Sequence, residues 1–266
     1  MNRSEKLLFL IKYLLSENTD YKDIDVPESE DERFRLFRSL VNVRPSKPVS
    51  EEFLTVQDEL LREKIAEKGV VNYKDLTPIK PHIYLWQGDI TTLKCGAIVN
   101  AANSGMLGCF CPCHGCIDNA IHTFSGVQLR LECAEIMHAL SASRKTLQGF
   151  EEPVGQAKIT DAYNLPCDKV IHTVGPYVGA KLTNEHCEQL RSCYRECLKT
   201  AVQNGISSIA FCCISTGEFH FPNEKAAEIA VETVDEFLRE NNNIEVIFNV
   251  FKDSDCTIYK RLLGGN

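Results

Sequence analysis

The chain lacks both an excess of positive charge and a long apolar run, the features by which many proteins bind nucleic acids or membranes. Its 29 Lys and Arg are outnumbered by 37 Asp and Glu, and a net charge of −8 argues against a general electrostatic grip on DNA, RNA or an anionic membrane. No uninterrupted apolar run approaches the roughly 20 residues that a membrane helix needs. The apolar residues 7–11 lie between two lysines and precede no small-residue cleavage site, unlike a signal peptide. We therefore expect a cytoplasmic protein with neither nucleic-acid nor membrane partners.

Cysteine, by contrast, is abundant. Without an export signal, the 13 cysteines are expected to remain reduced thiols. Cys193 and Cys197 fall four residues apart in a helical pattern, where a buried thiol behaves as a small apolar side chain. Cys212 and Cys213 lie in an apolar run with the same interpretation. The cysteines within residues 108–116 do not fit it.

Two regions of the chain differ in pattern. Residues 1–72 are rich in helix formers and helical periodicity, and we expect a helical extension packed on the main domain. Residues 73–266 alternate short apolar runs with helical patterns, which predicts an α/β domain around a largely parallel sheet. The expected strands are residues 82–87, 97–100, 157–163, 170–174, 209–214 and 245–251, and the expected helices of this domain are residues 117–140, 184–204 and 223–241.

Polar motifs follow several of these strands, at the sheet edge where α/β proteins bind ligands. Residues 88–91 read Gly-Asp-Ile-Thr and residues 100–103 read Asn-Ala-Ala-Asn; each alone also suits an ordinary turn or helix N-cap. Residues 215–222 lead from a strand into a helix. Such a loop can direct backbone N–H groups at a diphosphate, although singly it also suits a plain connection.

Together these motifs resemble the macrodomain family, over about residues 73–263. The resemblance includes Asp-Asn-Ala-Ile-His at 118–122 and His-Thr-Val-Gly-Pro at 172–176. It implies a three-layer α/β/α fold with a mixed, largely parallel sheet, and ADP-ribose as ligand. The residues that it assigns to the ligand are Asp89 and Ile90 at the adenine, Asn103 at the distal ribose, and Ser215, Thr216, Gly217, Glu218 and Phe219 at the diphosphate.

One stretch departs from the common macrodomain pattern. Where most members have a run of glycines, residues 108–116 read Gly-Cys-Phe-Cys-Pro-Cys-His-Gly-Cys. This is similar to the zinc-dependent macrodomain subgroup of bacteria and fungi, which has Cys-x4-His-x-Cys ahead of Ile-Asp-Asn and shares the N-terminal extension. The resemblance implies one zinc ion per chain, bound by Cys109, His114 and Cys116.

The chemistry of these side chains agrees with such a site. Thiolate and imidazole are ligands that tetrahedral zinc prefers, and three protein ligands would leave one coordination position open. Two alternatives remain. Cys111 or Cys113 could complete a closed structural site, or the cluster could consist of thiols without a metal.

The resemblance favours hydrolysis of mono-ADP-ribose from modified protein side chains. Zinc would activate water or polarise a ribose oxygen at the reacting centre. We expect Asp118 to position the water or act as base, Asn103 to orient the ribose, and Asn119 to belong to the same catalytic group.

Two other functions remain possible from the sequence: a reader that binds ADP-ribose without cleaving it, and a deacetylase of O-acetyl-ADP-ribose. The subgroup also implies a partner, a lipoyl-carrier protein modified by a sirtuin-type transferase.

Overall fold

The computed structural model describes residues 1–144 and 151–264. A six-stranded sheet with the order β2-β8-β7-β4-β6-β5 forms its centre. Neighbouring strands are parallel except for β5 and β6, which are antiparallel. The strands are β2 (Ile83–Gln87), β4 (Ala97–Ala102), β5 (Ala157–Asp161), β6 (Lys169–Val174), β7 (Ser208–Phe211) and β8 (Glu245–Val250), and a separate two-stranded pair joins β1 (Val71–Asn72) to β3 (Leu93–Lys94).

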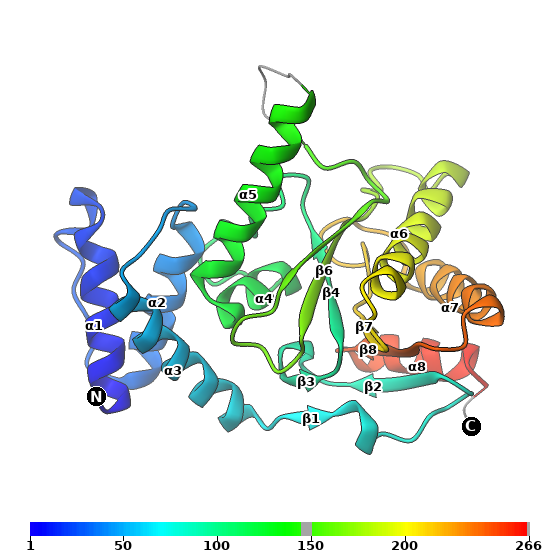
Figure 1. Ribbon diagram of the computed structural model, residues 1–266, viewed down its shortest axis with the longest axis horizontal. Helices are drawn as coiled ribbons and strands as arrows, with labels where there is room; N and C mark the ends of the chain where they lie inside the picture. Colours follow the sequence, from blue (N-terminus) through cyan, green and yellow to red (C-terminus); the bar gives the residue numbers. More distant parts are fainter. Residues whose placement is uncertain (145–150, 265–266) are drawn as a thin grey trace.

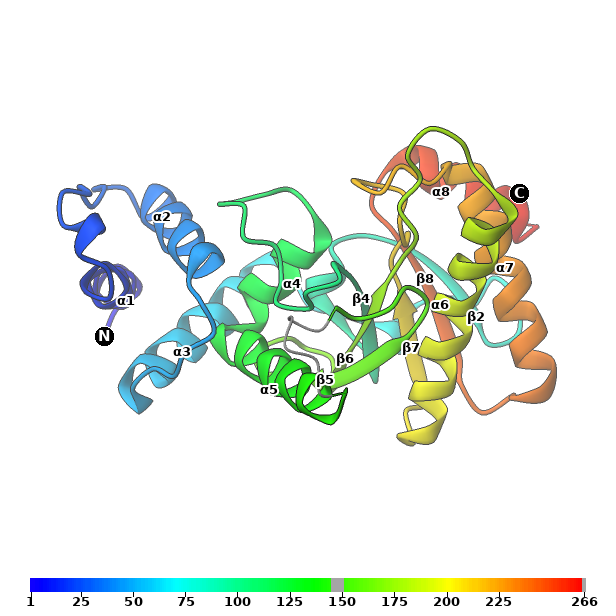
Figure 2. The same cartoon turned by 90° about the horizontal axis from the view of Figure 1, so that it is seen from above.

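Helices cover both faces of this sheet, which confirms the expected three-layer α/β/α class (Figures 1 and 2). One face carries α6 (Asn184–Gln203), α7 (Asn223–Glu240) and α8 (Asp253–Leu262). The other carries α4 (Ile117–Ser125) and α5 (Val127–Arg144). Short 3-10 turns, η2 (Tyr73–Asp75) and η3 (Ile90–Thr92), flank β2.

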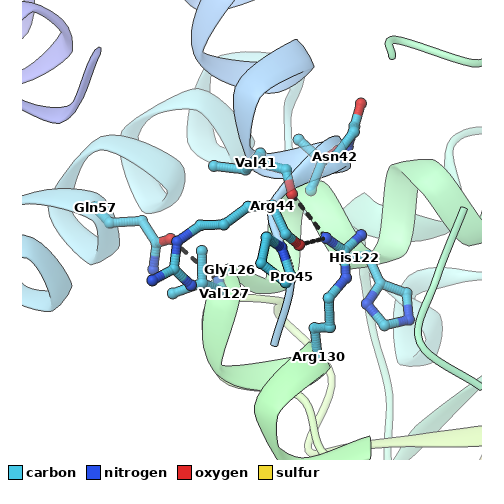
Figure 3. Close-up of a pocket in the computed structure, with 10 residues that line it drawn as sticks. Val41, Asn42, Arg44, Pro45, Gln57, His122, Gly126, Val127 and Arg130 are labelled. Atoms are coloured by element: carbon cyan, nitrogen blue, oxygen red, sulfur yellow. Dashed lines mark hydrogen bonds between the residues drawn. The ribbon is translucent and has the colours of Figure 1, made fainter. Parts of the chain in front are cut away.

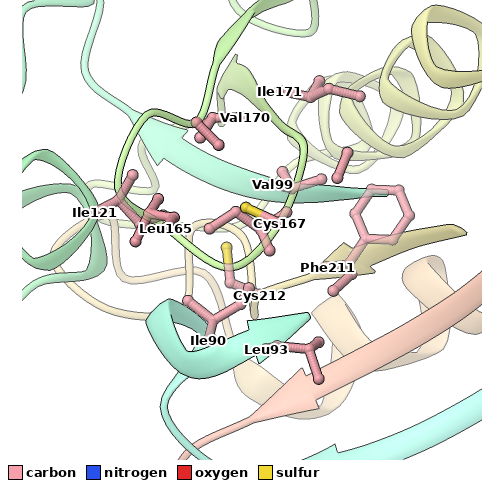
Figure 4. Close-up of a cluster of buried hydrophobic side chains, with 14 of the residues drawn as sticks. Ile90, Leu93, Val99, Ile121, Leu165, Cys167, Val170, Ile171, Phe211 and Cys212 are labelled. Carbon is pink, nitrogen blue, oxygen red and sulfur yellow. The ribbon is translucent and has the colours of Figure 1, made fainter. Parts of the chain in front are cut away.

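The central strands are apolar on both sides because helices cover both faces. Val99, Ile171 and Phe211 lie side by side at the centre of the core, with the thiols of Cys167 and Cys212 among them (Figure 4). Cys193 and Cys197 of α6 are also fully buried, as their helical spacing predicted.

The N-terminal extension is a group of helices beside α4: α1 (Arg3–Ser16), η1 (Thr19–Tyr21), α2 (Glu30–Val43) and α3 (Glu51–Lys68) (Figure 1). Asn2, Ser29 and Ser50 cap the N-termini of the three α-helices through their side chains. α2 and α3 both contact α4, and their apolar side chains join the same continuous core as the sheet. No helix in the two described ranges is long and apolar enough to cross a membrane.

Several predicted elements differ from the structure: the strand expected over residues 209–214 ends at Phe211, and the one expected over residues 157–163 ends at Asp161. The expected helix over residues 117–140 is two helices, because Gly126 between them has φ 101°. A Cβ there would lie 2.5 Å from Gln128 Oε1 and 2.6 Å from Gln57 Nε2. Only glycine adopts this backbone freely and fits so close to α3.

Candidate active site and metal centre

The sequence motifs converge because they follow parallel strands. Residues 88–92 follow β2, residues 103–116 follow β4, residues 175–183 follow β6 and residues 212–222 follow β7. Carboxyl ends of parallel strands meet at one edge of the sheet, so these four loops lie together there.

Cys109, His114 and Cys116 form one compact group, with ligand atoms that all lie within 4.8 Å of one another. Cys109 Sγ lies 3.6 Å from His114 Nδ1. With metal–sulfur and metal–nitrogen distances of about 2.3 and 2.0 Å, two ligands of a tetrahedral zinc ion stand about 3.6 Å apart. The donor set and its spacing therefore fit zinc.

The other two thiols of this loop do not face the group. Cys113 Sγ donates a hydrogen bond to Arg35 O, 3.3 Å away in α2, and Cys111 is exposed. This arrangement favours the set of three protein ligands over a closed site that recruits a fourth cysteine.

Asp118 lies in the first turn of α4, and only 3% of its surface is exposed. Asn100 Nδ2 donates to its Oδ1 at 2.8 Å, and Asn103 Nδ2 to its Oδ2 at 3.4 Å. Burial raises the pKa of Asp118 to about 6, against the opposing effects of the Asn100 hydrogen bond and the charge of Arg130. A carboxylate with such a pKa can accept a proton near neutral pH.

A hydrogen-bond chain that the sequence did not reveal holds Asp118 from behind. Asn100 of β4 is the register partner of His172 of β6, and its Nδ2 lies 3.1 Å from His172 Nδ1. An amide N–H only donates, so His172 Nδ1 accepts and its Nε2–H donates to Thr160 Oγ1 at 2.9 Å. Burial lowers the pKa of His172 to about 3, consistent with this neutral form.

Asn119, grouped with the catalytic residues by sequence, is fully buried beside Asp118. Its Oδ1 accepts from Arg38 and its Nδ2 donates to Cys111 O at 3.0 Å. These contacts hold the loop of residues 109–116 and occupy both ends of the amide.

At the opposite end of the site, Asp89 caps η3 and accepts from the Thr91 N–H at 3.0 Å. Burial alone would raise the pKa of Asp89, but hydrogen bonds from Lys68 and Thr91 outweigh it and hold that pKa below its usual value. Ile90 is buried beneath the turn. Phe251, which follows the adjacent strand β8, is 75% exposed.

The loop after β7 has the backbone of an anion site. Ser215 and His220 have φ of 64° and 55°, so the chain curls between them. Within the described ranges, the N–H groups of residues 217–219 have no hydrogen-bond acceptor. α7 starts three residues past His220, after Pro222, without a side-chain cap. Consecutive free N–H groups beside a helix N-terminus suit a diphosphate.

Side-chain contacts join the loop of residues 215–222 to the Cys109, His114 and Cys116 group and to the loop after β6. Glu218 Oε1 lies 3.6 Å from His114 Nε2, although 71% of the Glu218 side chain is exposed. Phe219 makes an edge contact with Tyr177 of the loop after β6, with ring centroids 6.0 Å apart. Sequence reasoning missed Tyr177, and its place directly after the His-Thr-Val-Gly-Pro motif is the signal that marked it.

Thr216 Oγ1 donates to Cys213 O at 3.0 Å and so stabilises the start of the same loop. Gly217 has open space around the position of a Cβ. The glycine that the loop requires is Gly175, where a Cβ would lie 2.0 Å from Ser215 Oγ. The structure thus brings Ser215 to Phe219 to one side of the site, Cys109, His114 and Asp118 to another, and Asp89 to the far end.

This three-layer fold with its loop cluster defines a macrodomain. The Macro domain family model matches residues 99–230, and the chain belongs to the macrodomain family. A protein of Treponema medium named protein-ADP-ribose hydrolase is 52% identical, covering 99% of this chain and 100% of the relative. A protein of Staphylococcus aureus (strain MSSA476) with the same name is 49% identical, covering 96% of this chain and 94% of the relative.

Solved structures agree in fold. The Oceanobacillus iheyensis macrodomain with ADP has a TM-score of 0.63 and 34% identity, covering 71% of this chain and 94% of that one. The Trypanosoma brucei macrodomain in complex with ADP-ribose has a TM-score of 0.64 and 30% identity, covering 85% of this chain and 95% of that one.

Proposed function

We propose that this protein is a hydrolase that removes mono-ADP-ribose from modified protein side chains, with one zinc ion held by Cys109, His114 and Cys116. The names of its relatives support the reaction. The observation that carries the proposal is the convergence of a metal-ligand group, a buried carboxylate and free backbone N–H groups on one edge of the sheet. Glu218, 3.6 Å from His114, joins the two sides.

Different residues of the site would bind the different parts of ADP-ribose. Asp89 and Ile90 would receive the adenine, with the exposed Phe251 ring available for stacking. The N–H groups of residues 217–219 would hold the diphosphate. Asn103, which already spans Asp118 Oδ2 and Gly108 O, would orient the distal ribose.

Hydrolysis adds water to the anomeric carbon and breaks its bond to the acceptor side chain. Asp118 would accept the proton of that water, and Asn100 keeps Oδ1 of its carboxylate fixed. When bound, zinc would supply Lewis-acid polarisation at the reacting centre. Asn119 would act as a positioning residue, since its amide contacts the loop and the extension.

The buried carboxylate favours a hydrolase over a reader. Burying Asp118 raises its pKa to about 6, an ionisation cost of about 3 kcal/mol relative to its ordinary 3.8. A base at this position needs a pKa close to neutral, whereas a protein that only binds ADP-ribose gains nothing from burying a carboxylate at this cost.

Asp118→Asn tests the assignment with little change in shape. Turnover, measured as ADP-ribose released from a modified protein, should fall by about 10²–10⁴-fold because general-base assistance has this magnitude. Calorimetry should show ADP-ribose affinity close to that of the wild type. Full turnover in the variant would refute Asp118 as the base.

Two further measurements separate the rival functions. A wild-type protein that binds ADP-ribose but releases none from any modified protein would be a reader. Acetate release from O-acetyl-ADP-ribose, with no action on modified proteins, would identify the deacetylase.

We also propose that the acceptor is a lipoyl-carrier protein modified by a sirtuin-type transferase, and that the enzyme works in the cytoplasm. The free state of the cysteines is compatible with a reducing compartment. Release of ADP-ribose from a modified carrier, compared with an unrelated modified protein, tests the acceptor.

A further inference from the structure

Helix α2 of the N-terminal extension bonds directly to the metal-binding loop, residues 109–116. Arg38 Nη2 donates to His114 O at 2.9 Å, so it holds the backbone of a metal-ligand residue. The same guanidinium donates through Nε and Nη2 to Asn119 Oδ1 at 3.1 and 2.7 Å. Its planar fork thus joins the loop to the first turn of α4.

One turn further along α2, Asn42 makes a second connection. Its Oδ1 accepts from Cys113 N at 2.9 Å, and its Nδ2 donates to Thr123 Oγ1 of α4 at 3.1 Å. Only 1% of Asn42 is exposed. Cys113 has φ 52°, a conformation that costs a non-glycine residue about 1 kcal/mol or more. The Asn42 contact therefore stabilises a strained point of the loop.

Arg130 of α5 ties the extension down next to this loop. It donates to Val41 O at 2.9 Å in the last turn of α2 and to O of the C-cap residue Arg44 (Figure 3). It also donates to Leu107 O at 2.7 Å. The cavity beside it, bordered by His122, measures only about 10 Å³. The end of α2 therefore leaves little space between itself and α4 and α5 at this point.

Few contacts within the loop fix its shape. Residues 109–116 contain no helix or strand, and one backbone hydrogen bond, His114 N to Cys111 O at 3.2 Å, lies within them. A metal site requires ligand positions fixed to within a fraction of an ångström. Contacts from outside the loop must supply that order.

We propose that Arg38 and Asn42 are positioning residues of the metal centre. They order residues 109–116 before a metal binds, so the extension is a working part of the active site. This inference rests on the proposed function for the identity of the metal, but the order of the loop can be measured without any metal.

Arg38→Ala is the principal variant, and Arg33→Ala is its matched control. Arg33 lies on the same helix and donates to Pro27 O and Ser4 Oγ, both 2.6 Å away and both inside the extension. Arg38→Lys keeps the charge but lacks the fork, so it should restore part of the effect. Circular dichroism of each full-length variant checks that it folds.

In the metal-free protein, amide hydrogen exchange of residues 109–116 should become faster in Arg38→Ala and Asn42→Ala, and remain as in the wild type in Arg33→Ala. Zinc affinity, measured by competition with a chromogenic chelator, should fall by about 10–100-fold, the usual loss when a partner behind a metal ligand is removed. ADP-ribose affinity should change little, because among the described residues the hydrogen bonds of Arg38 go to His114 and Asn119 and none goes to residues 212–222.

Unchanged exchange in Arg38→Ala, or equal losses in Arg33→Ala, would overturn the proposal. A wild-type protein without zinc affinity would contradict the proposed metal centre instead. In that case the exchange measurement alone decides whether α2 orders the loop.

Discussion

Replacing His172 with Gln tests the chain of hydrogen bonds behind Asp118 through the pH dependence of stability. The neutral His172 ring has a pKa of about 3 in the folded protein, compared with an ordinary value of 6.5. Below pH 6.5 the unfolded chain therefore binds a proton that the folded protein refuses. Its contribution to stability is complete above pH 6.5 and is lost as the pH falls towards 3.

The size of this loss follows from linkage. One histidine costs about 1.4 kcal/mol of unfolding free energy per pH unit, or about 2 kcal/mol between pH 6.5 and about pH 4.5. Urea unfolding at both pH values should show that His172→Gln loses less stability than the wild type by this amount. The comparison uses only the difference in unfolding free energy between the two pH values, so a lower starting stability of the variant does not affect it.

The surroundings of His172 decide the choice of control. The ring centroids of His122 of α4 and His172 are 6.1 Å apart, and Cys133 Sγ of α5 lies 3.9 Å from His172 Nε2. Burial is the main cause that lowers the pKa of His122, with smaller effects of His172 and Arg130, so most of the loss from His122 is common to both proteins. His138→Gln, an exposed site on α5, should leave the wild-type dependence unchanged. Parallel stability changes in the wild type and His172→Gln would refute the neutral, buried assignment.

Two other predictions concern the loops. Cys116→Ser should remove most of the zinc found by elemental analysis, whereas Cys111→Ser should keep about one ion per chain; equal loss in both would indicate a closed site. Gly175→Ala should lower the unfolding free energy by about 1–3 kcal/mol, because the added Cβ would lie 2.0 Å from Ser215 Oγ. Gly217→Ala, with open space at that position, should unfold like the wild type, and thermal melts without ligand compare the two.

The sequence predicted the sheet well because its strands are apolar runs buried on both faces. The bounds of β6 and β8 agree with the expected ranges 170–174 and 245–251 to within one residue. α8 was missed because its ten residues are mostly polar, and only Asp255, Cys256 and Tyr259 are buried. Such a short helix depends on packing against β2 and β8, which local pattern does not reveal.

The site was predictable where its residues are neighbours in sequence. The sequence spacing of Cys109, His114 and Cys116 was enough to identify these residues, and the structure places their ligand atoms together. Contacts across the chain are different. Arg38 is 76 residues from His114 in the sequence. Nothing in the local sequence around an arginine on a polar helix face predicts which distant residue it will contact. Asn100 was likewise quoted as part of a turn motif, and only strand register shows that it faces His172.

The N-terminal extension contacts two separate parts of the candidate site. Beside the Cys109, His114 and Cys116 group it contributes Arg38, and on the other side of the site Lys68 of α3 donates to Asp89 Oδ2 at 2.8 Å. Lys68 also lies over the Phe124 ring of α4, 3.3 Å from its centroid. Burial lowers the pKa of Lys68 despite the nearby Asp89 carboxylate, so its position is held by packing as well as by charge. Because α2 and α3 share one apolar core with α4, a displacement of the extension would alter the Arg38 and Lys68 contacts together.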